Sequence, residues 1–299
     1  MKVLLTGSAG QLGQALIAAV PKSVELIATS RKELDLADDG ACRAAVRRHK
    51  PDWVLNAGAY TAVDQAESQP ELAHAVNAVA PRAFAESLQV VGGQLLQIST
   101  DFVFNGSQGS PYQPDQERNP LGVYGSTKAA GEAAVHELLG EEGRSSIMRT
   151  SWVIGPVGKN FALTMLRLHR ERTQLGVVAD QVGCPTSTHN LAKACWRAIE
   201  RGSQKPLPPV MHWSDAGAAS WYDVAVSVGQ IGLELGLLDC AASVHPIGTS
   251  AYPTPAQRPA YSLLDCTSTR EALDLSAEHW QQALRHVLRL VQDEGLGSS

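Results

Sequence analysis

Short apolar runs alternate with longer helix-like segments along the first half of the chain. The short runs have the length of buried strands, and the longer segments have helical periodicity. Strands that alternate with helices in this way are typical of a parallel sheet wrapped by helices. We therefore predict an α/β fold with a Rossmann-like, doubly wound parallel sheet. The predicted strands are 3–5, 24–28, 53–55, 95–98 and 147–148, and the predicted helices are 11–19, 39–49, 71–91 and 125–139.

The pattern loosens after residue 150, where Pro and Gly separate shorter elements. Ser220 and Asp223 have the spacing of a capping box and predict the start of a helix that runs to Leu237. A last helix is predicted at 278–291. We expect this half of the chain to form a smaller C-terminal lobe.

A glycine-rich turn follows the first predicted strand. Gly7, Gly10 and Gly13 have the spacing G-x-x-G-x-x-G and lead into the helix predicted at 11–19. Glycine is needed where the backbone takes a positive φ, where it approaches a pyrophosphate, and where a helix packs closely on a strand. The helix N-terminus offers free N–H groups and a positive dipole end to phosphate. The position of this turn favours a dinucleotide-binding loop over an ordinary tight turn.

The end of the second predicted strand indicates which dinucleotide binds. An acidic residue there binds the ribose 2′-hydroxyl of NAD, whereas a cation accommodates the 2′-phosphate of NADP. Ser30, Arg31 and Lys32 stand here, with no acid at the strand end. These residues favour NADPH as the cofactor and leave NADH possible. For Lys32, a solvated charge in a loop is as good an interpretation as a phosphate contact.

Tyr124 and Lys128 are four residues apart, a spacing that puts two side chains on one helix face, and Tyr124 stands directly before the helix predicted at 125–139. A phenol has a pKa of about 10, so it handles a proton at neutral pH only beside a positive charge. Lys128 supplies this charge and can also hydrogen-bond the nicotinamide ribose. Alone, this spacing usually marks a surface pair. The residues expected to bind the cofactor are Gly7, Gly10, Gln11, Leu12, Gly13, Ser30, Arg31, Asp35, Leu36, Ala59, Tyr60, Thr61, Tyr124 and Lys128.

Thr100 follows the fourth predicted strand, at the carboxyl edge where ligands of open α/β sheets bind. Its hydroxyl can hydrogen-bond a substrate carbonyl near Tyr124, the alternative being a hydroxyl in a strand-end turn. We therefore expect an NAD(P)-dependent oxidoreductase with Tyr124, Lys128 and Thr100 as catalytic residues. Residues 1–155 are then the NAD(P)-binding domain, with later segments crossing back, and residues 156–299 are mainly a substrate-binding lobe.

Composition and charge narrow the class of protein further. The 299 residues are 44% hydrophobic and 18% charged, as in ordinary globular proteins. A net charge of -5 and the lack of a basic run argue against nucleic acid or anionic lipid as partners. No run approaches the roughly 18 apolar residues of a membrane span, and no signal-peptide pattern opens the chain, so we expect a cytoplasmic protein. The scattered cysteines are expected to be small core residues, and they are Cys42, Cys184, Cys195, Cys240 and Cys266.

Together, the glycine turn, Thr100 and the Tyr124–Lys128 pair resemble the extended short-chain dehydrogenase/reductase superfamily. Longer stretches resemble one family within it, the dTDP-4-dehydrorhamnose reductases. These stretches reach almost to the C-terminus, which makes the resemblance far more specific than either short motif. They are GQLG at 10–13, AYTAVDQAE at 59–67, STDFVF at 99–104, RTSWV at 149–153, GKNF at 158–161, DQVGCPT at 180–186, SWYD at 220–223 and RPAYSLLD at 258–265.

The resemblance implies a reaction, namely NAD(P)H-dependent reduction of the 4-keto group of dTDP-4-dehydro-L-rhamnose to dTDP-L-rhamnose. This is the last step of dTDP-L-rhamnose biosynthesis. In this reaction Tyr124 would donate a proton to the forming alkoxide and Lys128 would tune Tyr124. The implied substrate contacts are Thr100, Asp101 and Trp152 at the sugar, and Asn160, Gln181 and Arg258 at the nucleotide diphosphate. The alternative roles are a helix cap for Asn160, an amide in a loop for Gln181 and a surface cation for Arg258.

The sequence departs from the family in one respect. Some members pair their subunits through a magnesium ion held by acidic residues, one of them in the helix after the glycine turn. This chain has Gln14 and Ala15 there, and His189 and Asn190 in the later helix. Hard divalent cations prefer carboxylate oxygen, so we expect no metal site. A homodimer formed through another surface stays open.

Two alternatives to this reductase remain. Another nucleotide-sugar ketoreductase or an epimerase could use the same tyrosine and lysine, and stoichiometric NADPH consumption would separate a reductase from an epimerase. A non-catalytic, dinucleotide-binding regulatory subunit could share the fold. Intact Tyr124, Lys128 and Thr100 argue against this last alternative.

Overall fold

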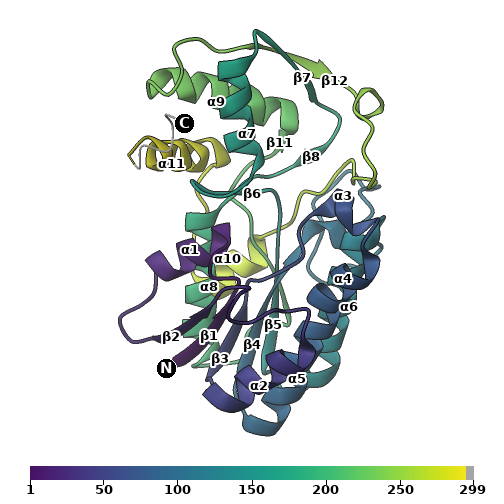
Figure 1. The fold of residues 1–299 in the computed structure, drawn as a ribbon, viewed down its shortest axis with the longest axis vertical. Coiled ribbons are helices and arrows are strands. Elements are labelled where there is room, and N and C mark those ends of the chain that lie inside the picture. Colours follow the sequence, from purple (N-terminus) through teal and green to yellow (C-terminus); the bar gives the residue numbers. More distant parts are fainter. Residues whose placement is uncertain (294–299) are drawn as a thin grey trace.

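A six-stranded sheet forms the lower part of the molecule in the computed structural model, which describes residues 1–293 (Figure 1). The strand order is β10-β5-β4-β3-β1-β2, and every neighbouring pair is parallel. The strands are β1 (Lys2–Thr6), β2 (Glu25–Thr29), β3 (Trp53–Asn56), β4 (Gln94–Thr100), β5 (Ser145–Thr150) and β10 (Val210–His212). The chain starts at β1, continues to β2 on one side and then crosses to β3 on the other. This reversal beside β1 is the topological switch point at which open α/β sheets bind ligands.

Helices cover both faces of this sheet, which confirms the predicted doubly wound architecture (Figure 1). On one face α1 packs against α8, with α10 beside them, and on the other α2 packs against α5 and α5 against α6. The helices are α1 (Gln11–Ala18), α2 (Asp39–His49), α3 (Val63–Ala66), α4 (Pro70–His74), α5 (Ala80–Val91), α6 (Val123–Leu139), α8 (Thr188–Gly202) and α10 (Thr267–Leu273).

Alternate side chains of the central strands enter different cores, because successive residues of a strand point to opposite faces. Val3 and Leu5 pack in the core that contains α1 and α8, whereas Leu4 packs in the core that contains α2 and α5. All three side chains are fully buried. Strands covered on both faces form continuous apolar runs, and this is why the runs predicted the sheet.

The helix predicted at 71–91 consists of three consecutive helical segments. A π-helical turn, η1 (Ala75–Val79), separates α4 from α5. Its Asn77 is buried, accepts a hydrogen bond from Tyr60 N and donates to Thr127 Oγ1 on α6. The π turn therefore joins the loop after β3 to the helix that carries Tyr124.

A smaller part lies above the sheet and has its own hydrophobic core (Figure 1). Three helices surround that core: α7 (Phe161–Glu171), α9 (Trp221–Glu234) and α11 (Trp280–Asp293). The predicted capping box is present at the start of α9, which ends three residues before the predicted end. The short strands here are β6 (Val153–Ile154), β7 (Gln174–Val178), β8 (Val182–Gly183), β9 (Thr186–Ser187), β11 (Ala219–Ser220) and β12 (Ser243–Ile247). They pair as β6 with β9, β7 with β12 and β8 with β11.

The chain crosses between the two parts several times after residue 150. β10 pairs with β5 at the edge of the large sheet, and α8 and α10 cover one of its faces. The boundary at 155/156 stays a prediction, and the last six residues of the predicted lobe, 294–299, lie outside the described part.

Most of the cysteines are buried, as predicted, and none forms a disulfide. Cys240 is the exception, because it lies exposed in the loop between α9 and β12, where no core covers it. Among residues 1–293, no helix has the length and apolarity needed to cross a membrane.

Candidate active site

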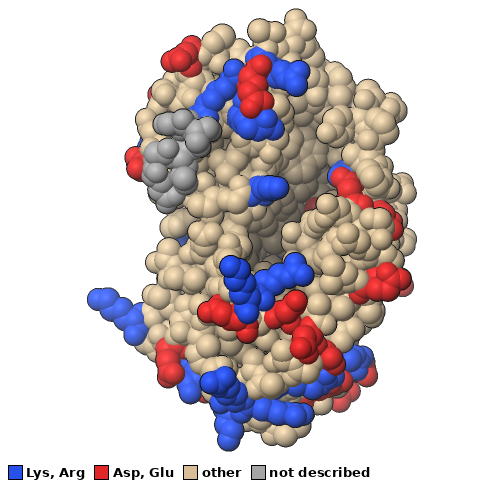
Figure 2. Space-filling view, viewed as in Figure 1, with Lys and Arg blue, Asp and Glu red and all other residues tan. Residues whose placement is uncertain are grey.

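A cavity of about 620 Å³ lies between the two parts, at the carboxyl ends of the central strands. Figure 2 shows this hollow in the molecular face, with Lys and Arg side chains near its rim and mainly uncharged walls. The predicted residues that line it are Gly7, Gly10, Gln11, Leu12, Gly13, Arg31, Asp35, Leu36, Ala59, Tyr60, Thr61, Thr100, Asp101, Tyr124, Lys128, Trp152 and Arg258. Residues from distant segments thus meet in one space.

The glycine turn forms a close-fitting cradle at one end of the cavity. Gly7 has φ +68°, and a Cβ there would lie 2.7 Å from Gly58 Cα. A Cβ on Gly13 would lie 2.2 Å from Gly7 O. No side chain caps α1, so the first N–H groups of the helix are left for a ligand. This cradle fits the diphosphate of a dinucleotide.

The predicted selectivity residues lie at the same end. Arg31 lines the cavity, and its Nε lies 3.8 Å from Asp35 Oδ1. Its side chain is 78% exposed, so this ion pair leaves the guanidinium free to take another partner. Ser30 does not line the cavity, and its backbone N–H donates to the Glu33 carboxylate at 2.7 Å.

Tyr124, Lys128 and Thr100 meet in the centre of the cavity. The Lys128 ammonium donates to Ile98 O at 2.6 Å. The Thr100 hydroxyl donates to Asp101 Oδ1 at 3.0 Å. A hydrogen bond therefore joins the threonine hydroxyl to the carboxylate, and the phenol lines the same cavity.

Burial dominates the protonation of these groups. It raises the pKa of Tyr124 to about 12, which the nearby Thr100 hydroxyl offsets only in part. It lowers the pKa of Lys128 to about 8, against the field of the Glu132 carboxylate. It raises the pKa of Asp101 to about 6. At neutral pH the phenol therefore holds its proton and most of Lys128 is a cation.

The sequence prediction missed one wall of the cavity. Trp221 at the start of α9 stacks on Trp152, with ring centroids 3.6 Å apart and an interplanar angle of 9°. Both rings line the cavity, and Trp152 has a φ of +47°, which a non-glycine residue adopts only when its surroundings enforce it. The SWYD motif at 220–223 indicates only a helix start and a family match, so the sequence does not place Trp221 at the site.

Two of the predicted diphosphate contacts do not line the cavity. Asn160 caps α7 by accepting a hydrogen bond from Leu163 N at 3.0 Å, which is the helix cap considered as its alternative. Gln181 is buried and accepts a hydrogen bond from Trp221 Nε1 at 3.1 Å. Gln181 therefore holds the tryptophan that lines the cavity.

Arg258, the third of these residues, does line the cavity. Its Nη2 lies 2.8 Å from Asp64 Oδ2, and this ion pair joins the loop after β12 to α3. Asp64 was not predicted as a site residue. Arg258 holds the pKa of Asp64 below its usual value, so the carboxylate stays charged.

The positions considered for a metal hold other contacts. Gln14 donates to Ala9 O, and Asn190 donates to Asp215 Oδ1. Within residues 1–293, no group of three His, Cys, Asp or Glu side chains could hold a metal ion.

Comparisons with known proteins agree with the geometry of the site. The family model of the RmlD substrate binding domain matches residues 1–292. A dTDP-4-dehydrorhamnose reductase of Sinorhizobium fredii is 36% identical over 298 residues, which cover 99% of each chain. The crystal structure of a reductase of this name from Clostridium acetobutylicum has a TM-score of 0.89 at 36% identity and covers 98% of this chain and 100% of that one.

A further solved structure includes the cofactor. It is a dTDP-4-dehydrorhamnose reductase from Bacillus anthracis in complex with NADP, with a TM-score of 0.87 at 32% identity, and it covers 97% of this chain and 99% of that one. Family model, sequence and structure all match over nearly the full length. The chain therefore belongs to the family of dTDP-4-dehydrorhamnose reductases, through its RmlD substrate binding domain.

Proposed function

We propose that this enzyme reduces the 4-keto group of dTDP-4-dehydro-L-rhamnose to dTDP-L-rhamnose with NADPH. The observation that carries the proposal is the meeting of Tyr124, Lys128 and Thr100 in a cavity that also contains the glycine cradle. The names of the relatives support the choice of substrate, and the NADP-bound relative supports the choice of cofactor.

The cavity offers a partner for each part of NADPH. The glycine turn and the N-terminus of α1 would hold the diphosphate, Arg31 the 2′-phosphate, and Lys128 the nicotinamide ribose. When bound, NADPH supplies the hydride that reduces the sugar carbonyl.

Tyr124 is the group that supplies the proton. Its phenol is neutral at physiological pH, because burial raises its pKa to about 12. When negative charge develops on the keto oxygen, the phenol donates its proton to that oxygen. The Lys128 cation then stabilises the phenolate that remains.

The remaining residues would position the sugar nucleotide. The stacked rings of Trp152 and Trp221 form an apolar wall for the sugar, and Thr100 and Asp101 offer hydrogen bonds. Arg258 would bind the diphosphate through charge-assisted hydrogen bonds. Asn160 and Gln181, also predicted as contacts, would act by holding their neighbours in place.

The test is NADPH oxidation with dTDP-4-dehydro-L-rhamnose, with the product identified by NMR. Tyr124→Phe removes the proton donor and keeps the ring, so turnover should fall by roughly 10²–10⁴ while NADPH still binds. Tyr252→Phe is the matched control, because it removes an exposed phenol that does not line the cavity. Unchanged turnover in Tyr124→Phe would rule out the mechanism. Epimerised sugar without net NADPH consumption would favour an epimerase.

The cellular setting completes the proposal. We expect a cytoplasmic enzyme that acts on a dTDP-sugar and has neither nucleic acid nor membrane as a partner. We propose that a homodimer of this chain would need no bridging metal. Light scattering with and without a chelator tests this.

A further inference from the structure

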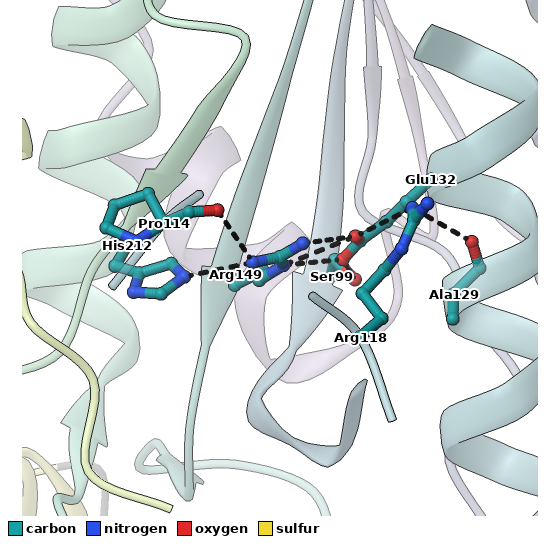
Figure 3. A network of polar contacts seen from close by, with 7 residues as sticks. All are labelled: Ser99, Pro114, Arg118, Ala129, Glu132, Arg149 and His212. Atoms are coloured by element: carbon teal, nitrogen blue, oxygen red, sulfur yellow. Dashed lines mark hydrogen bonds and ion pairs between the residues drawn. The ribbon is translucent and has the colours of Figure 1, made fainter. Parts of the chain in front are cut away.

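A fully buried ion pair lies next to the reacting residues. Glu132 is on α6, one turn beyond Lys128, and its side chain is 0% exposed. Arg149 is on β5 and is 3% exposed. Its Nη2 donates to Glu132 Oε2 at 2.8 Å and its Nε to Oε1 at 3.0 Å. The guanidinium therefore binds both oxygens of the carboxylate, as Figure 3 shows.

The pair belongs to a network that spans three strands and a helix (Figure 3). Ser99 Oγ on β4 donates to Glu132 Oε1 at 2.5 Å, and Arg118 Nη1 lies 3.4 Å from Oε2. Arg149 Nη1 donates to Pro114 O at 3.1 Å and lies 3.3 Å from His212 Nε2 on β10. Both carboxylate oxygens are thereby hydrogen-bonded, which a buried charge requires.

His212 takes part in this network as a neutral ring. Its Nδ1 lies 3.1 Å from Tyr112 O, a carbonyl that can only accept, so this nitrogen carries the proton. Nε2 is then free to accept from Arg149. Burial, together with the Arg149 charge, lowers the pKa of His212 to about 3, so the ring adds no charge at neutral pH.

The network touches the site through adjacent backbone positions. Ser99 and Arg149 are register partners in the β4–β5 ladder. Each stands one residue before a threonine that lines the cavity, Thr100 and Thr150. Glu132 therefore joins α6, which carries the tyrosine and lysine, to the strand end that carries the catalytic threonine.

The spacing along α6 places the charges on one face. Tyr124, Lys128 and Glu132 follow one another at intervals of four residues, so their side chains are neighbours along the helix. Apart from burial, the carboxylate of Glu132 is the one influence that shifts the pKa of Lys128 among the described groups.

A need for stability alone does not explain this ion pair. Replacing a buried ion pair by apolar residues of similar size is often neutral or stabilising, because burying two charges costs much of what their attraction contributes. An ion pair therefore gives this position something that apolar packing cannot provide. The ion pair fixes the orientation of α6 relative to β5, and it places a negative charge near Lys128.

We propose that Glu132, held by Arg149, is a positioning residue for the reduction. It fixes α6 against the ends of β4 and β5, and its carboxylate is the counter-charge of Lys128. This inference rests on the proposed function, because Lys128 must act there as a cation beside Tyr124.

Other charged groups on the elements packed around α6 are engaged elsewhere. On α5, Arg82 and Glu86 are partly exposed and take part in surface ion pairs. Asp64 on α3 pairs with Arg258, and Glu71 and His74 on α4 are exposed. Asp101, in the 3₁₀ turn after β4, accepts the Thr100 hydroxyl. Glu67, just after α3, accepts a hydrogen bond from Val123 N at the start of α6, and the charge of Asp101 acts on Tyr124. Among the described groups, Glu132 is the carboxylate whose charge acts on Lys128.

The proposal predicts the direction of a pH effect. The cationic form of Lys128 is the active form, so activity falls as pH rises through its pKa. Glu132→Gln removes the negative charge and leaves Arg149 uncompensated, and both changes disfavour the Lys128 cation. The alkaline limb of the kcat/KM profile should therefore move to lower pH by about 1 unit. The ratio of the kcat/KM of Glu132→Gln to that of wild type should therefore be about tenfold lower at pH values well above the limb than at pH values below it.

Two variants provide matched controls. Glu137→Gln removes a carboxylate from the same helix, at a position that is 63% exposed, and should leave the limb unchanged. Glu132→Asp keeps the charge but shortens its reach, so it should lower kcat and leave the limb near its wild-type position. A purely structural role would lower activity in Glu132→Gln at all pH values equally, and an unmoved limb would overturn the proposal.

A further variant covers the case in which Glu132→Gln fails to fold. Glu132→Gln combined with Arg149→Gln leaves no unpaired charge of this ion pair in the core. Its limb should also move to lower pH, because the carboxylate that acts on Lys128 is lost. A wild-type limb in the folded double variant would overturn the proposal. If wild-type enzyme failed to oxidise NADPH with the keto sugar, the proposed function would fail instead, so the two failures are distinguishable.

Discussion

Gly13→Ala tests whether the glycine turn is as close-fitting as the structure indicates. A Cβ on Gly13 would lie 2.2 Å from Gly7 O and 2.7 Å from Ser8 Cα. These are backbone atoms, so no side chain can swing aside, and the turn and α1 must separate by ~0.8 Å to reach the shortest tolerated contact of 3.0 Å. Overpacking of this kind costs about 1–3 kcal/mol. At roughly 2–4 °C per kcal/mol, the melting temperature should fall by about 2–12 °C.

Gly10→Ala is the matched control in the same turn. Its Cβ would have one close neighbour, Gly7 O at 3.2 Å, and its φ of -77° suits any residue. The assays are thermal unfolding without ligand and titration with NADPH. Gly13→Ala should be the less stable variant and should bind NADPH at least about tenfold more weakly than wild type, because displaced N–H groups lose about one charge-assisted hydrogen bond. Equal melting temperatures for the two variants would refute the reasoning.

Two further predictions concern the rim of the cavity. Arg31→Asp should move the ratio of kcat/KM values from NADPH towards NADH, whereas Lys32→Asp, the same charge change one residue on and outside the cavity lining, should not. An unchanged ratio would place Arg31 away from the 2′-phosphate. Asp64→Asn removes the ion pair that holds Arg258 in place at the cavity. KM for the sugar nucleotide should therefore rise about two- to fivefold with kcat retained, which is the size expected for a partly exposed ion pair. A KM equal to that of wild type would show that this ion pair does not contribute to substrate binding.

The large sheet was predictable because its strands are buried on both faces. Runs such as Val3–Leu5 are apolar at every position, and the intervening helices follow at regular intervals. The second half could not be read in this way. Strands of two residues, such as Val153–Ile154, have no period, and β10 joins the sheet through a partner more than 50 residues away. Their pairing depends on tertiary packing, which local patterns do not contain.

The family resemblance alone places His189 and Asn190 in a helix, although that helix, α8, also has a local signal. α8 buries Leu191, Cys195 and Ile199 at intervals of four residues, and Trp196 lies on the same side. This is the spacing of an amphipathic helix, and a periodicity count after residue 150 would have found it. The helix therefore has a signal in the sequence, whereas the two-residue strands have none.

Site residues followed a different rule. Motif positions whose role depends on the backbone, such as Gly7 and Gly13, were predictable because backbone geometry alone decides them. Amide side chains were not, because an amide can satisfy either a ligand or the protein. Asn160 is used by a helix N-terminus and Gln181 by an indole N–H, and both partners come from folded neighbours that the sequence does not place.

The hydrogen bonds at the centre of the site restrict which group can act as the acid. Thr100 has one hydroxyl proton, and it donates that proton to Asp101. The Tyr124 phenol lines the same cavity and keeps its own proton at neutral pH, because burial raises its pKa to about 12. A keto oxygen that enters the site could take a proton from Thr100 only by competing with Asp101. Because the pKa of Asp101 is about 6, its carboxylate is charged at neutral pH and holds the threonine proton more strongly than a neutral ketone would. We therefore propose that Tyr124, and not Thr100, protonates the ketone, while Thr100 stays hydrogen-bonded to Asp101.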